Sequence, residues 1–108
     1  MKSITEIIPI DQIRNCRSII ERNRVYYNAQ DSFKILFPDI SDTNVSRHLQ
    51  YVDNSEKTLY KAVDDVGRSS LYITLRGLIF TVFRLDKDIS KQLKDYSIDA
   101  IIKSLNSF

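Results

Sequence analysis

The sequence predicts an α+β fold made of two β-hairpins and about four helices, with strands and helices segregated along the chain. Two segments rich in β-branched and aromatic residues each surround a short polar turn, which is the pattern of a hairpin. After each of them, apolar residues recur at three- and four-residue steps, as in amphipathic helices. The order is therefore hairpin, two short helices, hairpin, two helices, which is typical of the α+β class.

The first hairpin is predicted over residues 16–28, with a polar turn at residues 22–24. Isoleucine, valine and tyrosine fill the two flanking strands. A helix over residues 11–23 is the competing interpretation, because the apolar residues there also fit helical spacing. Ahead of this segment, several isoleucines provide an apolar face, but Pro9 would interrupt a long helix.

Two short helices are predicted next, over residues 29–37 and 42–52. Asn28 can cap the first of them, and Pro38 ends it. A tight turn then leads into the second helix. Helical spacing predicts an inward face for the second helix. It consists of Val45, either His48 or Leu49, and Val52.

The second hairpin is predicted over strands 58–63 and 69–74, and Gly67 in its turn can supply a positive φ. A strongly apolar helix over residues 75–85 follows, with Thr74 as its possible cap.

Residues 86–88 break this helix. The last element is a single amphipathic helix over residues 89–105, for which Asp88 is a suitable N-cap.

Composition limits the possible functions. The 108 residues fit one small domain, 1–108, and Cys16 and His48 are the only cysteine and histidine. The chain therefore forms no internal disulfide, and it offers too few ligands for a zinc site. It has no glycine-rich phosphate loop and no apolar stretch of membrane-spanning length. We expect an intracellular domain that is not an enzyme, that holds no metal or cofactor and that does not enter a membrane.

A polar face on the second short helix is the strongest candidate binding site. Amide side chains can pair with adenine edges, and arginine can pair with guanine edges. Because another helix precedes it across a tight turn, the pair resembles a helix-turn-helix whose second helix reads bases. The alternative is an ordinary solvated helix face. The residues on this face are Thr43, Asn44, Arg47 and Gln50.

Basic side chains on the two hairpins are candidates for phosphate contacts. The second hairpin would act as a basic wing, although Asp64 and Asp65 at its tip would repel a phosphate backbone. The first hairpin gathers arginines beside two tyrosines, for which a solvated turn is the alternative. The net charge of +2 is too small to decide between these interpretations. The candidates are Arg22, Arg24, Lys57, Lys61 and Arg68.

Two stretches carry a family resemblance. Residues 25–31, Val-Tyr-Tyr-Asn-Ala-Gln-Asp, look like an aromatic strand that runs into a helix, and residues 72–78, Tyr-Ile-Thr-Leu-Arg-Gly-Leu, look like a strand that enters a helix through Gly-Leu. Over residues 13–105 the chain resembles the Bro-N domain of baculovirus repeated-ORF proteins and phage antirepressors, a neighbour of the KilA-N viral DNA-binding domains. Tyr96 stands where that family carries a tryptophan.

The resemblance implies a viral or phage protein that binds double-stranded DNA and regulates transcription or acts as an antirepressor. Its location would be the cytoplasm of a bacterial host, or the nucleus or cytoplasm of an infected eukaryotic cell.

A second copy of the chain is the other expected partner. The apolar helix over residues 75–85 and the apolar C-terminus offer more hydrophobic surface than we expect one small core to absorb. A two-fold homodimer would bury this surface and duplicate the base-reading helix for a palindromic site. The competing hypothesis is a viral inhibitor that binds a host or phage protein through its hairpins and apolar C-terminus, and the nearly neutral charge favours it over DNA binding.

Overall fold

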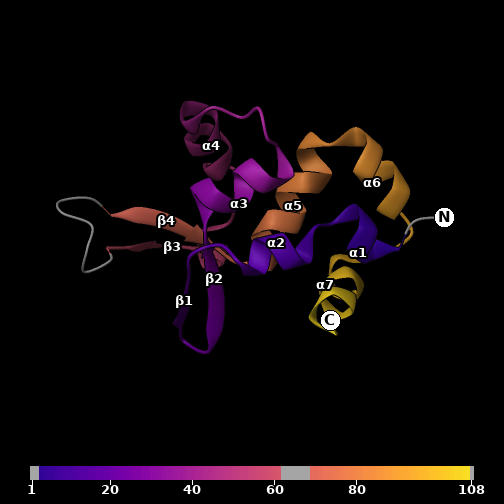
Figure 1. Ribbon diagram of the computed structural model, residues 1–108, viewed down its shortest axis with the longest axis horizontal. Helices are drawn as coiled ribbons and strands as arrows, with labels where there is room; N and C mark the ends of the chain where they lie inside the picture. The colour runs from indigo at the N-terminus through magenta and orange to yellow at the C-terminus, as the bar shows by residue number, and fades with distance from the viewer. Residues whose placement is uncertain (1–2, 62–68, 108) are drawn as a thin grey trace.

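The computed structural model describes residues 3–61 and 69–107, and this part of the chain confirms the predicted α+β class (Figure 1). It contains seven α-helices, more than predicted, together with one 3-10 helix and four strands. In chain order they are α1 (Ile4–Ile7), α2 (Ile10–Arg14), β1 (Ser18–Glu21), β2 (Arg24–Asn28), α3 (Ala29–Leu36), α4 (Asp42–Leu49), η1 (Asn54–Glu56), β3 (Lys57–Tyr60), β4 (Ser70–Ile73), α5 (Leu75–Leu85), α6 (Lys87–Leu93) and α7 (Ile98–Asn106).

The first hairpin is confirmed. β1 pairs with β2, and the turn between them holds Arg22 and Asn23 at positive φ angles of 54° and 63°. Such a pair of angles fits the two-residue turn whose twist matches that of the strands. The competing helix over residues 11–23 is wrong, because α2 ends at Arg14 and β1 begins four residues later.

The two hairpins share a base and then diverge (Figure 1). Their strands form one antiparallel sheet in the order β1-β2-β4-β3, and β2 pairs with β4 at Tyr27 and Asn28. From there the β1–β2 hairpin runs to the bottom of the view, and β3–β4 runs to the left. β3 ends at Tyr60, earlier than the predicted strand over residues 58–63. The turn predicted around Gly67 lies outside the described residues.

The core lies where α3 and α5 meet the shared base of the sheet. Phe33 of α3, Ile73 of β4 and Leu78 of α5 are all fully buried there. α5 has the predicted bounds, and the Thr74 hydroxyl caps it by accepting a hydrogen bond from the backbone N–H of Gly77. α1 packs against α7 on the far side of α5 (Figure 1).

The single helix predicted over residues 89–105 is wrong, because the chain forms α6 and α7 instead. The hydroxyl of Ser97 accepts a backbone N–H in the first turn of α7 and so starts a new helix. The predicted N-cap is also wrong. Asp86, not Asp88, caps α6, since its carboxylate accepts from the backbone N–H of Ile89 at 3.0 Å.

The hydrophobic surplus that suggested a dimer is largely absorbed by this one core. The helix α5 packs its apolar face inward, and α7 does the same, so most of these side chains contact their own chain. These side chains are thus buried without a second chain, and the homodimer stays a prediction. The buried members are Leu75, Leu78, Ile79, Val82, Ile101 and Leu105.

Candidate nucleic-acid interface

α3 and α4 form the expected pair of short helices. Their apolar sides are buried at Phe33, Val45 and Leu49, which fixes the packing between them. An ion pair of 2.7 Å between Lys34 on α3 and Asp42 on α4 also links the two helices. α4 therefore stands with one face in the core and its opposite face towards solvent (Figure 1).

The outward face of α4 brings the four predicted base-reading residues together. Thr43, Arg47 and Gln50 are exposed, while Asn44 is half-buried. α4 ends at Leu49 instead of residue 52, so Gln50 occupies its C-cap. Within the described part of the chain, the side chains of these four residues have no hydrogen-bond or ion-pair partner. They are consequently available to a ligand.

Two of the predicted phosphate ligands are instead bound within the chain. The Nζ of Lys57 donates to the backbone carbonyl of Leu49 at 2.7 Å and so caps the C-terminus of α4. Arg24 donates to both carboxylate oxygens of Glu56 and to the carbonyl of Ser55. These internal acceptors already neutralise or hold both cations, which makes them weaker candidates for a phosphate contact.

Of the remaining phosphate candidates, Arg22 lies away from α4 and is not part of the candidate interface. Arg22 is exposed at the turn of the β1–β2 hairpin, which lies at the bottom of Figure 1 while α4 lies at the top. Lys61 is exposed and directly follows β3, on the hairpin predicted to be a wing. Arg68 lies outside the described residues, as do Asp64 and Asp65. Lys61 is thus the candidate that still fits a wing.

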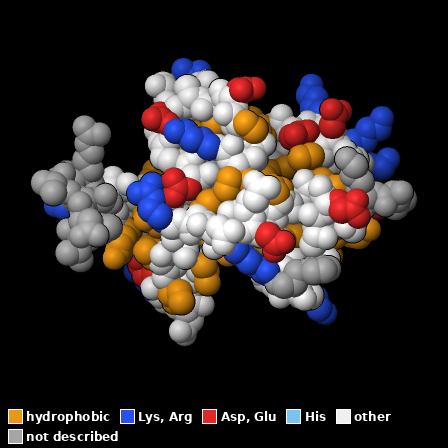
Figure 2. All heavy atoms as spheres, viewed as in Figure 1, with side chains coloured by type: hydrophobic (Ala, Val, Ile, Leu, Met, Phe, Trp, Pro, Cys, Tyr) orange, Lys and Arg blue, Asp and Glu red, His pale blue; other side chains and the backbone are white. Residues whose placement is uncertain are grey.

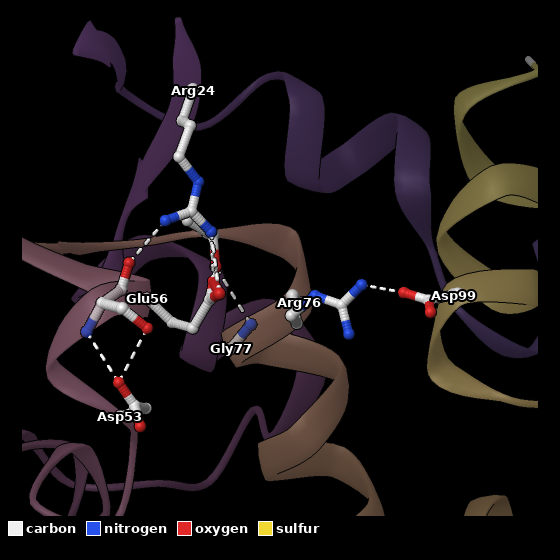
Figure 3. A network of polar contacts seen from close by, with 8 residues as sticks. Arg24, Asp53, Glu56, Arg76, Gly77 and Asp99 are labelled. Atoms are coloured by element: carbon white, nitrogen blue, oxygen red, sulfur yellow. Dashed lines mark hydrogen bonds and ion pairs between the residues drawn. The ribbon is translucent and has the colours of Figure 1, made fainter. Parts of the chain in front are cut away.

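A polar junction holds α4 and the sheet in place (Figure 3). Glu56 in η1 accepts from Arg24 on β2 and, at 2.7 Å, from the hydroxyl of Thr74 at the start of α5. Asp53 caps η1 by accepting two hydrogen bonds from Ser55, and these bonds hold the pKa of Asp53 below its ordinary value. The segment that follows α4 is therefore tied to both hairpins and to α5.

A cleft of about 700 Å³ opens between the end of α4, η1 and the start of α5. Two aromatic side chains line it, Tyr51 at 57% exposure and Phe80 at 42%. Arg76 also lines the cleft, but its guanidinium is ion-paired with Asp99 of α7 (Figure 3). Because Gln50 belongs to both surfaces, the cleft is continuous with the polar face of α4.

Arg84 is a basic residue near this face that the sequence analysis missed. Its guanidinium carbon lies 3.6 Å from the centroid of the Tyr51 ring, in a cation–π contact. The sequence does contain a sign of this outward side of α5. Arg76, Phe80 and Arg84 recur every four positions, and all three are exposed. The high apolar content of this helix indicates a core element and masks the polar and aromatic residues on its outward side.

His48 is a half-buried residue of α4. Its Nδ1 is buried and has no hydrogen-bond partner among the described residues. Burial lowers the pKa of His48, and the positive charges of Arg84 and Arg47 lower it further. Arg47 of α4 and Arg84 of α5 thus both contribute positive potential at His48.

Charge is mixed on the face of the molecule drawn in Figure 2. Basic and acidic side chains are interspersed there, with basic ones gathered over α6, where Lys87 and Lys91 are exposed. Apolar side chains gather over the two hairpins. On the hairpin strands β1 and β3, respectively, Ile20 is 78% exposed and Leu59 is 66% exposed.

Residues 3–61 and 69–107 contain no group of three or more side chains that could hold a metal ion. No helix in these residues has the length and apolar character needed to cross a bilayer. Cys16 is half-buried, and burial together with the nearby Asp31 carboxylate raises the pKa of its thiol, against the opposing effect of Arg17.

No match was found when the chain was compared with models of protein families, with curated proteins and with solved structures. The Bro-N resemblance therefore stays a prediction. The candidate interface depends on the arrangement of α3, α4 and α5 and on the side chains that these helices expose.

Proposed function

We propose that the chain is a Bro-N-like viral or phage domain that binds double-stranded DNA through α4, and that it regulates transcription or acts as an antirepressor. The observation that carries the proposal is the outward face of α4. It exposes Thr43, Arg47 and Gln50 without internal partners, while the rest of the helix is fixed by the core. A rigid helix with free polar side chains is what base reading in a major groove requires.

Each side chain has a distinct role in this proposal. Arg47 pairs with a guanine edge, and Asn44 and Gln50 pair with adenine edges. Thr43 lies nearest the N-terminus of α4 and contacts a base edge or its phosphate. Lys61, on the flanking hairpin, binds a backbone phosphate and contributes affinity without sequence preference. A homodimer would present two copies of α4 to a palindromic site.

The proposal is tested by the fluorescence anisotropy of labelled duplexes of mixed sequence at two salt concentrations. We expect micromolar binding that weakens steeply with salt, because phosphate contacts release counterions. Site selection then provides a preferred duplex. Arg47→Ala should lose most of the preference for it, whereas Lys61→Ala should weaken binding to all duplexes about equally.

A matched control separates a lost contact from a lost fold. Lys57→Met removes a lysine on the same hairpin that is already bound to Leu49. We expect it to lower stability but to leave the sequence preference unchanged. No binding to any duplex at low salt would exclude the proposed function for this chain.

Binding of a host or phage protein is the second candidate function. The sheet register places Ile20, Val25 and Leu59 on one face, because paired residues and alternate residues of a strand share a side. All three are exposed, with Ile20 and Val25 on one hairpin and Leu59 on the other, and exposed large apolar side chains are typical of protein-binding surfaces. Capture of one specific host or phage protein by the wild type, lost in Ile20→Ser/Leu59→Ser, would favour this function.

A further inference from the structure

We propose that Arg84 of α5, stacked on Tyr51, is a phosphate-binding residue that extends the α4 site along the DNA backbone. This inference depends on the proposed DNA-binding function and assigns that site a contact on a second helix.

Within the described residues, Arg84 differs from most other arginines because its guanidinium has no internal acceptor. Most arginines in the described residues already bond to an internal acceptor: Arg17 to Asp31, Arg24 to Glu56, Arg76 to Asp99, and Arg14 to the carbonyl of Leu105. Arg84 and Arg47, by contrast, have no carboxylate or carbonyl partner among the residues that the structure describes. Arg22, at the distant hairpin turn, is the other arginine of this kind.

The location of Arg84 relates it to α4. Tyr51 follows α4 directly along the chain, and its ring lies against the Arg84 guanidinium. Arg47 on α4 and Arg84 on α5 are both exposed, and the positive charges of both lower the pKa of His48 on α4. Unpaired cations on the surface produce a positive potential, which attracts an anion.

The stacking on Tyr51 holds the Arg84 guanidinium in an orientation suited to binding a phosphate group. A guanidinium that lies flat on an aromatic ring keeps its N–H groups in the plane and directed past the ring edge. The ring also restricts the long side chain before a ligand arrives, which reduces the conformational entropy lost on binding. A planar fork of donors matches two oxygens of a phosphate, so the chemistry favours a backbone phosphodiester over a base edge.

The test compares Arg84→Ala with wild type in anisotropy titrations on mixed-sequence duplex over a range of salt concentrations. Loss of one phosphate contact should reduce the slope of log affinity against log salt by about 0.9 and weaken binding roughly five- to tenfold near 0.1 M salt. The loss should be similar on every duplex. Arg84→Lys should keep most of the slope but lose affinity, because lysine retains the charge and lacks the stacked fork.

Arg22→Ala is the matched control, because it also removes an exposed, unpaired arginine but from the far hairpin turn. It should leave both slope and affinity unchanged. Far-ultraviolet circular dichroism checks that each variant is folded. An unchanged slope and affinity in Arg84→Ala, with a wild type that binds, would overturn this inference alone. A wild type that does not bind DNA would overturn the proposed function and this inference with it.

Discussion

Arg24 on β2 and Glu56 in η1 form the ion pair that links the first hairpin to the segment between α4 and the second. One Nη of Arg24 donates to a Glu56 oxygen at 2.8 Å, and the side chain of Glu56 is only 15% exposed. Glu56 also accepts from Thr74, which caps α5. A single carboxylate thereby joins both hairpins to the longest helix of the described chain.

Glu56→Gln should destabilise the fold, because the neutral amide weakens a charge-assisted bond and leaves Arg24 without an anion. We expect a loss of about 1–3 kcal/mol in the free energy of unfolding. Urea denaturation measures it. Asp95→Asn is the control, since Asp95 is exposed and has no bonded partner among the described residues, and it should change stability little. Equal stability of the two variants would contradict a structural role for Glu56.

Separate replacements of Asp86 and Asp88 test which of the two aspartates caps the N-terminus of α6. Asp86→Ala removes the acceptor for the Ile89 N–H and should cost about 1 kcal/mol. Asp88→Ala removes a carboxylate that has no cap bond and should cost clearly less. Thermal unfolding of both variants gives the comparison, and a larger loss for Asp88→Ala would contradict the observed capping.

Gly77→Ala should destabilise the chain although alanine is the better helix former. A Cβ at this position would lie 2.7 Å from Cγ1 of Ile73, which is fully buried and cannot move aside. Overpacking costs about 1–3 kcal/mol, against about 1 kcal/mol gained from helix propensity. Ser46→Ala, at an exposed position in α4, gains propensity without a clash and should be neutral or slightly stabilising. A net gain in the urea midpoint of Gly77→Ala would refute the close contact.

Stability should fall as the pH drops below about 6.5, the ordinary pKa of histidine, partly because of His48. Burial and the two arginines lower its pKa in the folded state. Between the lowered and the ordinary pKa, the unfolded chain binds a proton that the folded chain does not, so acid favours unfolding. Urea unfolding at pH 7.5 and 5.5 should show a smaller loss for His48→Gln than for wild type. An identical loss would contradict the proposed burial effect.

The elements with strong local signals could be predicted from the sequence. The polar turn at Arg22 and Asn23, the Asn28 cap of α3 and the Thr74 cap of α5 are each decided by a few neighbouring residues. Amphipathic spacing likewise placed the outward face of α4. The four candidate residues therefore share one face as predicted, because α4 and its C-cap carry all of them, while their role in base reading stays a prediction.

The predictions that failed have two different causes. The apolar periodicity of residues 89–105 suited one helix and outweighed a local signal, the Ser97 cap that starts α7. The other failures depend on contacts between distant segments. From the sequence, Lys57 and Arg24 are predicted to be free for phosphate. In the fold, the Leu49 carbonyl accepts from Lys57, and the Glu56 carboxylate accepts from Arg24. The stacking of Arg84 on Tyr51 joins residues far apart in the chain, so no local pattern reveals it.

Backbone amide chemical shifts, followed by NMR while an unlabelled mixed-sequence duplex is added, test the central claim most directly. Our account predicts shifts concentrated at Thr43, Asn44, Arg47 and Gln50, with weaker changes at Tyr51 and Arg84, and little change at the turn of the β1–β2 hairpin. Shifts confined to the hairpins, or none at DNA concentrations well above the micromolar range, would contradict DNA binding through α4.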